Sequence, residues 1–188
     1  MKGPASLSQM SPEMMPILPF FSGIENRYLE GWDRFGFSIF AAAVGAANTS
    51  VRIRNPQGSN VVAVIEGIQC FSGPQAGPLA DAPFVGYKTL LVSNLANVQT
   101  SNYIGLDARG RAQPTVIISS GSGIAAGLVS IMQVAYGANG FVQFIQHEEQ
   151  EITLLPGSAL DTIGNVLNQG ITVSYMWRER FLEDSERS

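Results

Sequence analysis

The chain has 188 residues, of which 45% are hydrophobic, so it is long enough for one domain with a substantial core. Charged residues make up only 14% of the chain and the formal net charge is −4, which argues against the basic surface of a nucleic-acid-binding protein. An uncharged polar surface of this kind suits a protein that packs against copies of itself or other partners.

Neither a disulfide nor a membrane span is expected. Cys70 is the single cysteine, so no intrachain disulfide can form, and its apolar neighbours predict a buried thiol. Prolines interrupt the first residues, which do not resemble a signal peptide, and the longest apolar stretch, residues 124–136, is too short to cross a bilayer. We therefore expect a soluble protein that is made in a cytoplasm.

Residues 1–23 are predicted to form an extended arm ahead of a single β-sandwich domain at 24–188. Four prolines in this arm remove backbone donors and disfavour a helix. The arm ends near Phe20 and Phe21, whose apolar side chains need cover from a neighbouring subunit or from the chain's own domain. A disordered tail is the alternative.

Strand patterns dominate the chain from residue 31 onward. Val51 and Ile53 alternate with two arginines, residues 55–60 contain turn-forming Asn, Pro and Gly, and residues 61–65 are an apolar β-branched run. This pattern predicts a β-hairpin. Glycines and prolines then indicate a loop over residues 72–83.

Further short strands are expected along the rest of the chain. Their ranges are 88–93, 103–106, 115–118, 129–136, 141–147, 151–155 and 171–177. An Asn-Gly turn between 129–136 and 141–147 predicts a second hairpin, and residues 158–167 form either another strand or a connection. Many short strands with Gly, Pro and Asn between them predict an all-β fold, an antiparallel β-sandwich of jelly-roll-like form.

The last expected strand ends in the most distinctive polar cluster of the chain. Its apolar residues occur at every second position from Ile171 to Trp177 and face one side, and the residues between them face the other. The candidate subunit contacts are Phe20, Phe21, Trp177, Arg178, Glu179, Arg180 and Phe181. Arg forms paired hydrogen bonds with carboxylates, and Arg and aromatic residues are enriched at binding hot spots. A solvated strand end is the alternative.

Three patterns resemble parts of enzyme sites, but each lacks an essential feature. Residues 121–127 have the spacing GxGxxxG rather than GxGxxG and lie in a chain without alternating helices and strands, which argues against dinucleotide binding. The single histidine, His147, cannot supply the several histidines of a cupin metal site. Glu148, Glu149 and Glu151 could form a carboxylate pair of the kind that glycosidases use. Solvated acids at the start of a strand explain them as well, and adjacent carboxylates on a strand point to opposite faces. We therefore expect no enzymatic activity, cofactor or metal.

Two parts of the chain resemble structural proteins of tailed bacteriophages. One is an Arg-x-x-Asn-Pro-x-Gly-Ser pattern at residues 52–59, and the other combines Pro-Gly-Ser at 156–158 with Trp-x-Glu-Arg at 177–180. Between residues 67 and 150 no such resemblance is found. The resemblance implies a virion β-sandwich and carries no catalytic residues.

The leading hypothesis is therefore a non-enzymatic virion structural protein. It would be a capsid decoration or cement subunit, or a subunit of the tail, adaptor or fibre, made in the host cytoplasm and located in the virion. Its partners would be copies of itself in a trimer or higher ring and other virion proteins, without nucleic acid or membrane. The alternative is a carbohydrate- or receptor-binding β-sandwich with Phe84, Tyr87 and Tyr103 as an aromatic platform.

Overall fold

The computed structural model describes residues 31–43, 45–72, 84–91, 93–99, 103–106, 113–133, 141–145 and 151–186. The chain divides into two units, residues 1–32 and 33–188, and every described strand belongs to the second unit. The arm predicted for residues 1–23 lies outside the described residues, so the arm stays a prediction.

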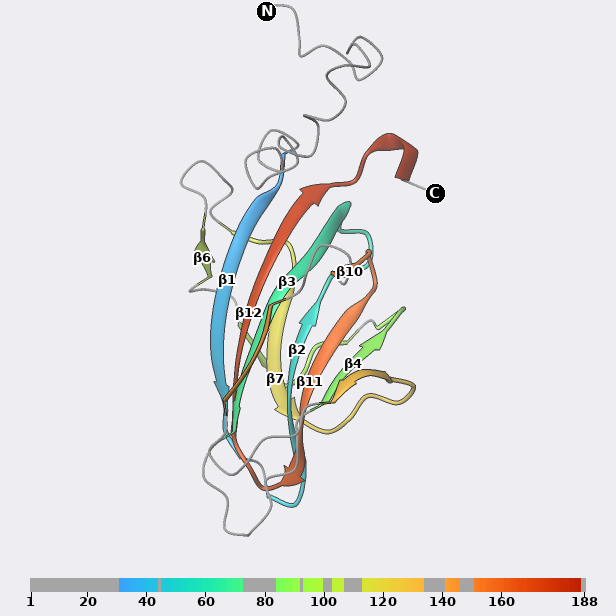
Figure 1. The fold of residues 1–188 in the computed structure, drawn as a ribbon. Coiled ribbons are helices and arrows are strands. Elements are labelled where there is room, and N and C mark those ends of the chain that lie inside the picture. Colours follow the sequence, from blue (N-terminus) through green and yellow to red (C-terminus); the bar gives the residue numbers. More distant parts are fainter. Residues whose placement is uncertain are drawn as a thin grey trace, which may run out of the picture. The chain divides into compact units, whose positions relative to one another are not determined.

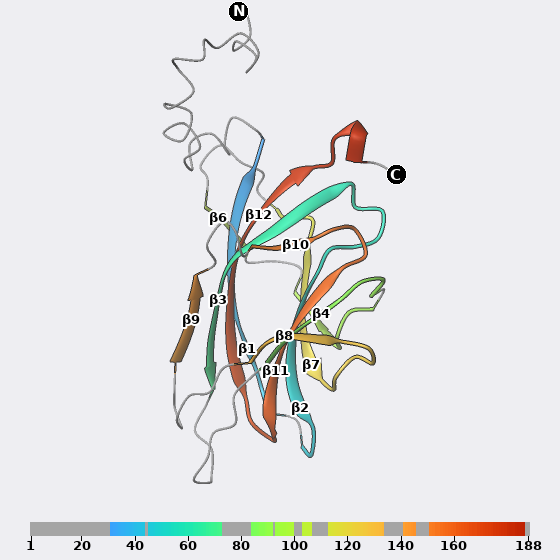
Figure 2. The ribbon, with the colours of Figure 1, turned by 45° about the vertical axis from the view of Figure 1, so that its right-hand side comes forward.

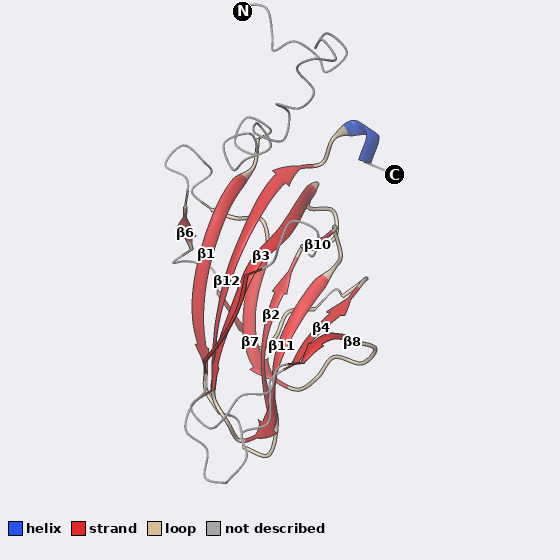
Figure 3. Ribbon diagram, viewed as in Figure 1, coloured by secondary structure: helices blue, strands red, loops and turns tan. Residues whose placement is uncertain are grey.

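The described part of the chain is an all-β fold. Its strands are β1 (Asp33–Ala41), β2 (Asn48–Arg54), β3 (Val61–Ser72), β4 (Phe84–Lys88), β5 (Asn97–Val98), β6 (Ile104–Gly105), β7 (Ile117–Ser122), β8 (Val129–Gln133), β9 (Phe141–Ile145), β10 (Ile152–Leu154), β11 (Ala159–Leu167) and β12 (Ile171–Phe181). One 3-10 turn follows at Asp184–Glu186. Figure 3 shows how strands make up nearly all of the regular structure.

The strands form two antiparallel sheets that face each other (Figure 1). Sheet A has the order β10-β3-β12-β1-β6, with β9 also paired to β3. Sheet B has the order β5-β7-β2-β11-β4-β8. The predicted antiparallel β-sandwich is therefore confirmed.

The pairing between strands is nested, which makes the sandwich jelly-roll-like. Strand β1 pairs with β12, β2 with β11, β3 with β9 and β10, and β4 with β8, as in one long hairpin. This hairpin is rolled up so that β12 also pairs with β3 and β11 with β4. Figure 2 shows the two resulting layers, with β9 beside β3 at the edge of sheet A. Two interlocked Greek keys of this kind define a jelly roll.

Between β4 and β8, residues 89–128 add strands to both sheets, and we call this segment the excursion. Strand β7 adds to β2 in sheet B, and β5 adds to β7. Strand β6 adds to β1 in sheet A. The excursion therefore contributes to the same side of both sheets.

The core lies between the sheets and is built from the inward positions of alternating strands. Its largest members are Phe35, Ile53, Ile65, Ile68, Ile118, Leu154, Leu160, Ile171, Tyr175 and Trp177. The alternation predicted for the last strand is confirmed, since every inward residue from Ile171 to Trp177 is buried. The ring of Trp177 stacks on Phe35 with centroids 5.7 Å apart and meets the edge of Tyr103 at 6.2 Å.

The first predicted hairpin is wrong in its pairing, although both of its strands exist. Strand β2 lies in sheet B and β3 in sheet A, so residues 55–60 cross from one sheet to the other. Asn55 holds this crossing, because its side-chain amide donates to the carbonyls of Val61 at 2.7 Å and Leu154 at 2.8 Å. Its backbone also bonds to residues 157–158. The crossing at residues 55–60 thus lies beside the Pro-Gly-Ser turn at residues 156–158, which joins β10 of sheet A to β11 of sheet B.

The second predicted hairpin is wrong for the same reason. Strand β8 belongs to sheet B and β9 to sheet A, and the Asn-Gly turn between them lies outside the described residues. The open question about residues 158–167 is answered, because β11 occupies most of them and pairs with both β2 and β4.

Candidate interaction surface

The predicted contact cluster at the end of β12 is divided between the inside and the outside of the sandwich. Trp177 and Glu179 are both fully buried in the described part of the chain. Neither side chain has surface to offer a partner, so the prediction that these two residues are subunit contacts is corrected. Side chains of a strand point alternately to its two faces. Trp177 points inward, so Glu179, two residues later, points inward as well.

Glu179 fastens the excursion to the inside of the sandwich. Its carboxylate accepts hydrogen bonds from the backbone N–H of Thr115 at 2.8 Å, the backbone N–H of Val116 at 3.1 Å and Nε1 of Trp177 at 2.9 Å. Tyr103 lies beside it and donates its hydroxyl to the carbonyl of Gln99. Burial raises the pKa of Tyr103, and the Glu179 charge adds to this rise. These hydrogen bonds stabilise the buried carboxylate, and they connect β12 to residues 115–116 of the excursion.

Arg178 points to the outer face of sheet A and belongs to an ion network that joins β1, β12 and β3 to Glu151, the residue before β10. It makes paired hydrogen bonds to Glu151, at 2.6 and 2.5 Å, and a third to Glu66 at 3.1 Å. Arg34 binds the other oxygen of Glu66 at 2.8 Å. Burial alone lowers the pKa of Arg178, but the hydrogen bonds that it donates to Glu151 and Glu66 outweigh this effect and the net pKa is raised. The side chain of Arg178 is only 8% exposed, so its charge is largely used within the chain.

A β-bulge in β3 places Glu66 in this network. The pairing with β12 shifts by one residue between Met176 and Trp177, which leaves Glu66 as the extra residue of β3. Ile65 and Ile68 both point into the core. Glu66 and Gly67 therefore both lie on the outer face, and the Glu66 carboxylate reaches Arg178.

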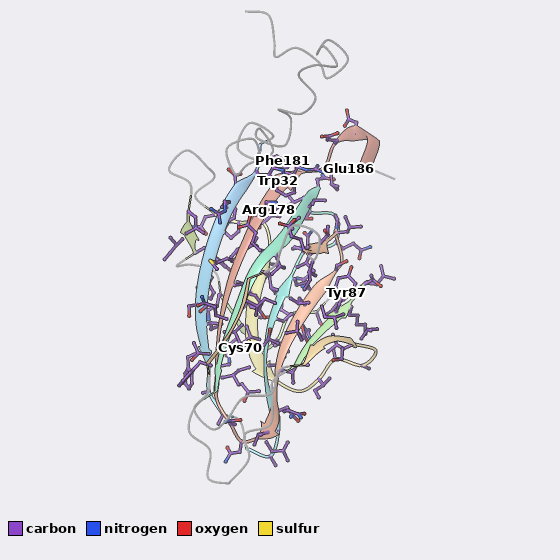
Figure 4. The ribbon with its side chains drawn as sticks, in the orientation of Figure 1. Trp32, Cys70, Tyr87, Arg178, Phe181 and Glu186 are labelled. Atoms are coloured by element: carbon purple, nitrogen blue, oxygen red, sulfur yellow. The ribbon has the colours of Figure 1, made fainter. Side chains whose placement is uncertain are left out.

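Arg180 and Phe181 lie where β12 ends, as Figure 4 shows for Phe181, with Glu186 in the following turn. Arg180 makes two hydrogen bonds of 2.6 Å to the Glu186 carboxylate, which holds the 3-10 turn against the strand. These bonds, helped by the N–H of Glu183, lower the pKa of Glu186 to about 2. Phe181 is 61% exposed and stays a candidate contact. Phe20 and Phe21 lie outside the described residues, so the structure does not test them.

The outer face of sheet A beside the ion network is uncharged. We define the neutral face as the outward positions of the three central strands below the network: Gly36, Ser38, Phe40, Gly67, Gln69, Phe71, Thr172, Ser174 and Met176. None of these nine residues is charged. Phe40 and Phe71 flank Thr172 in one cross-strand row and are 64% and 40% exposed. Sequence reasoning identified the outward residues of β12 but missed these two phenylalanines.

The outer face of sheet B is different, because the chain covers it. Arg52 and Asp161 form a buried ion pair, with two hydrogen bonds of 2.6 and 2.7 Å. A segment of the excursion lies over this pair, and the carbonyl of Ser93 accepts a further bond from Arg52 at 2.9 Å. Arg54 donates to the side chain of Asn94, and burial followed by the nearby Arg52 charge lowers the pKa of Arg54. Arg52 and Arg54, which point away from the core, are therefore covered by the chain itself.

The aromatic platform of the alternative hypothesis does not form in the described residues. Tyr103 packs against Phe37 and Trp177. Tyr87 is half-buried and its hydroxyl donates to Ser158 at 3.0 Å. The side chain of Phe84 lies outside what the structure describes. The tyrosines are therefore parts of the fold rather than a sugar-binding surface.

Chemistry-bearing groups are otherwise sparse in the described part of the chain. It contains no cluster of three or more metal-ligating side chains, while His147, Glu148 and Glu149 lie outside the described residues. It also contains no helix long and apolar enough to cross a membrane. Burial raises the pKa of the Cys70 thiol to about 12, so this cysteine is protonated and unreactive at neutral pH.

Comparisons with protein-family models, with curated proteins and with solved structures found no match for this chain. Its candidate function therefore rests on its own residues. Among the described residues, the neutral face combines an uncharged surface with two exposed phenylalanines, Phe40 and Phe71.

Proposed function

We propose that this chain is a virion structural protein, a capsid decoration, cement, tail, adaptor or fibre subunit that acts by protein–protein contact. The neutral face of sheet A carries the proposal. The two phenylalanines on it are exposed, and its polar groups are uncharged, so the desolvation cost of covering it is small. Surfaces of this type are typical of contact sites rather than of free solvated faces.

The charge distribution supports the same proposal. The charged side chains at the end of sheet A form pairs within the chain, and the ion pair on sheet B is buried. These charges are used within the chain, so the neutral face is where we expect a partner to bind. The phage-like motifs at residues 52–59 and 156–158 add the expectation that the partners are copies of this chain and other virion proteins.

The test is whether the chain occurs in purified particles of the phage that encodes it. We expect quantitative peptide mass spectrometry to find it in gradient-purified particles at a fixed copy number relative to the major capsid protein. The variant Ser174→Glu places a charge in the middle of the neutral face and should lower that copy number at least tenfold. Gln57→Glu adds the same charge at an exposed position between β2 and β3 and should not. Absence of the wild-type chain from particles would overturn the proposal.

A further inference from the structure

We propose that residues 93–99, which we call the strap, cover a binding site for an extended acidic segment of a partner protein and lift off when that segment binds. The site lies on the outer face of sheet B, so it goes beyond the proposed function, which rests on the neutral face of sheet A. Three features of this region support the site: the charge beneath the strap, the way the strap is held, and the edge of β7.

The positive charge beneath the strap is not balanced. Arg52 and Arg54 both point to the outer face of sheet B and are only 3% and 8% exposed. Asp161 accepts two hydrogen bonds from Arg52, so its carboxylate is already used. Arg54 has no carboxylate partner in the described part of the chain, and burial together with the Arg52 charge lowers its pKa. Two guanidinium groups and one carboxylate leave one positive charge over, which one further carboxylate would neutralise.

The strap offers these two arginines only uncharged acceptors. The carbonyl of Ser93 accepts a hydrogen bond from Arg52 at 2.9 Å, and the side-chain oxygen of Asn94 accepts one from Nε of Arg54 at 2.8 Å. A carboxylate can bind two nitrogens of an arginine at once and adds an opposite charge, which neither of these acceptors does. An acidic side chain is therefore a better partner for Arg54 than the strap is.

The strap is held mainly by hydrogen bonds and buries little of its own surface. Leu95 is half-buried and donates its backbone N–H to the Ser119 hydroxyl at 3.0 Å, whereas residues 96–98 are exposed. The strap passes over Gly121, and the hydroxyl of Ser50, which pairs with Gly121 across the sheet, is buried without a hydrogen-bond partner. Segments with few buried apolar contacts open at low free energy while the rest of the fold stays intact.

Lifting the strap also frees the edge of a strand. The strap pairs with β7 at only two positions, and the N–H of Gln99 adds one hydrogen bond to the carbonyl of Ile118. None of the residues of β7 is charged. A freed edge of this kind can pair with an extended backbone, which is a common way for sheets to bind peptides. The edge thus selects an extended segment, and Arg54 selects an acidic side chain on it.

Asn94→Asp tests the unbalanced charge within the chain itself. The variant supplies a carboxylate oxygen where the Asn94 oxygen lies, 2.8 Å from Nε of Arg54, so it should hold the strap closed. We expect hydrogen exchange at the Leu95 and Gln99 amides to slow at least about tenfold relative to the wild type, in which both should exchange together and faster than the amides of β2. Asn97→Asp adds the same charge at an exposed position of the strap and should leave this exchange unchanged. Equal exchange in the two variants would overturn the inference.

A disulfide across the strap tests whether the strap must lift for binding. A Cβ at position 121 would lie 3.9 Å from that of Ala96, within the usual disulfide range of about 3.5–4.5 Å. The same Cβ would crowd Leu95 at 3.2 Å, so the double variant Ala96→Cys, Gly121→Cys should be closed when oxidised and favour the open strap when reduced. The probe is a blocked fluorescent peptide of valine and threonine with one central glutamate, and anisotropy measures its binding. Oxidation should weaken this binding at least about tenfold.

A second peptide, with glutamine in place of the glutamate, tests the acidic side chain. It should bind the reduced double variant at least about tenfold more weakly. Absence of binding by the glutamate peptide at about 1 mM, or equal binding by the two peptides, would overturn the acidic segment as the occupant. Equal binding before and after oxidation would show that the strap does not cover the site. Circular dichroism must show the same strand signal for all variants, and the presence of the chain in particles is measured separately, so a failure here leaves the proposed function standing.

Discussion

Glu179 is the residue whose role changes most between sequence and structure. In the sequence it stands between two arginines and resembles part of a charged surface cluster. In the folded chain it is fully buried, and its carboxylate accepts hydrogen bonds from Thr115, Val116 and Trp177. It therefore connects the last strand with the excursion that follows β4.

Glu179→Gln tests this role at the scale of one residue. Glutamine keeps one acceptor oxygen but presents an NH2 group where the second oxygen was, so the N–H of Thr115 faces another donor. We expect the free energy of unfolding to fall by about 1–3 kcal/mol, the usual cost of a buried polar group without a partner. Urea denaturation measures it, and hydrogen exchange at Thr115 and Val116 should accelerate.

The matched control for this variant is Glu183→Gln, which removes one carboxylate at an exposed position just beyond β12. Its effect on stability should stay within about 0.5 kcal/mol. Equal stabilities of the two variants would show that Glu179 does not hold the excursion.

At the scale of elements, the strands could largely be predicted but their partners could not. The alternation of Val51 with Ile53 and the apolar run at 61–65 mark real strands, because side-chain period is a local property. Pairing is not local. Residues 55–60 have the composition of a hairpin turn, but six residues also suffice to cross between two sheets, and only the contacts of Asn55 with distant residues decide between them.

The candidate site shows the same division between local and distant information. The inward direction of Glu179 follows from that of Trp177 by simple alternation, so the signal for its burial was present in the sequence. The partners of Arg178 were not predictable, since Glu66 is 112 residues away in the chain and reaches it through a bulge. The neutral face combines three strands and needed the strand order to be seen.

Arg178→Ala tests the ion network that joins β1, β12 and β3 to Glu151, the residue before β10. The change leaves the carboxylates of Glu66 and Glu151 close together without the guanidinium between them. We expect a loss of about 2 kcal/mol in unfolding free energy, between the ~0.5 kcal/mol of an exposed pair and the ~3–5 kcal/mol of a buried one. Chemical denaturation measures this loss.

Arg180→Ala is the matched control, since its pair with Glu186 is more exposed, and it should cost less than about 1 kcal/mol. If Arg178→Ala instead weakened association while leaving stability unchanged, Arg178 would be a subunit contact, as the sequence alone predicted.

The turn after β12 should respond to acid. Hydrogen bonds from Arg180 lower the pKa of Glu186 from 4.5 to about 2, so the pairing stabilises the turn above pH 4.5 and is lost as the pH falls towards 2. A carboxyl titration followed by NMR should therefore give a midpoint near 2 for Glu186. Arg180→Ala should return the midpoint towards 4.5, and a wild-type midpoint near 4.5 would show that the pairing does not persist in solution.

At the scale of the whole molecule, charged residues make up 14% of the chain, and the outer faces of the two sheets differ in where these residues lie. Sheet B is covered by its own excursion, with Arg52 and Asp161 paired beneath it. Sheet A ends in an internally paired ion network and otherwise presents neutral side chains. The composition predicted contact with partners, and the strand arrangement identifies the side of the sandwich where we expect it.

The position of β12 also has a consequence for how the protein is made. It is the last strand in the chain, yet it lies between β1 and β3 in sheet A. Strand β1 therefore leaves the ribosome roughly 140 residues before its main partner, a wait of about 7–30 s at about 5–20 residues per second. During translation, the apolar sides of both strands need a chaperone or transient contacts, and the core closes only after synthesis has passed Phe181.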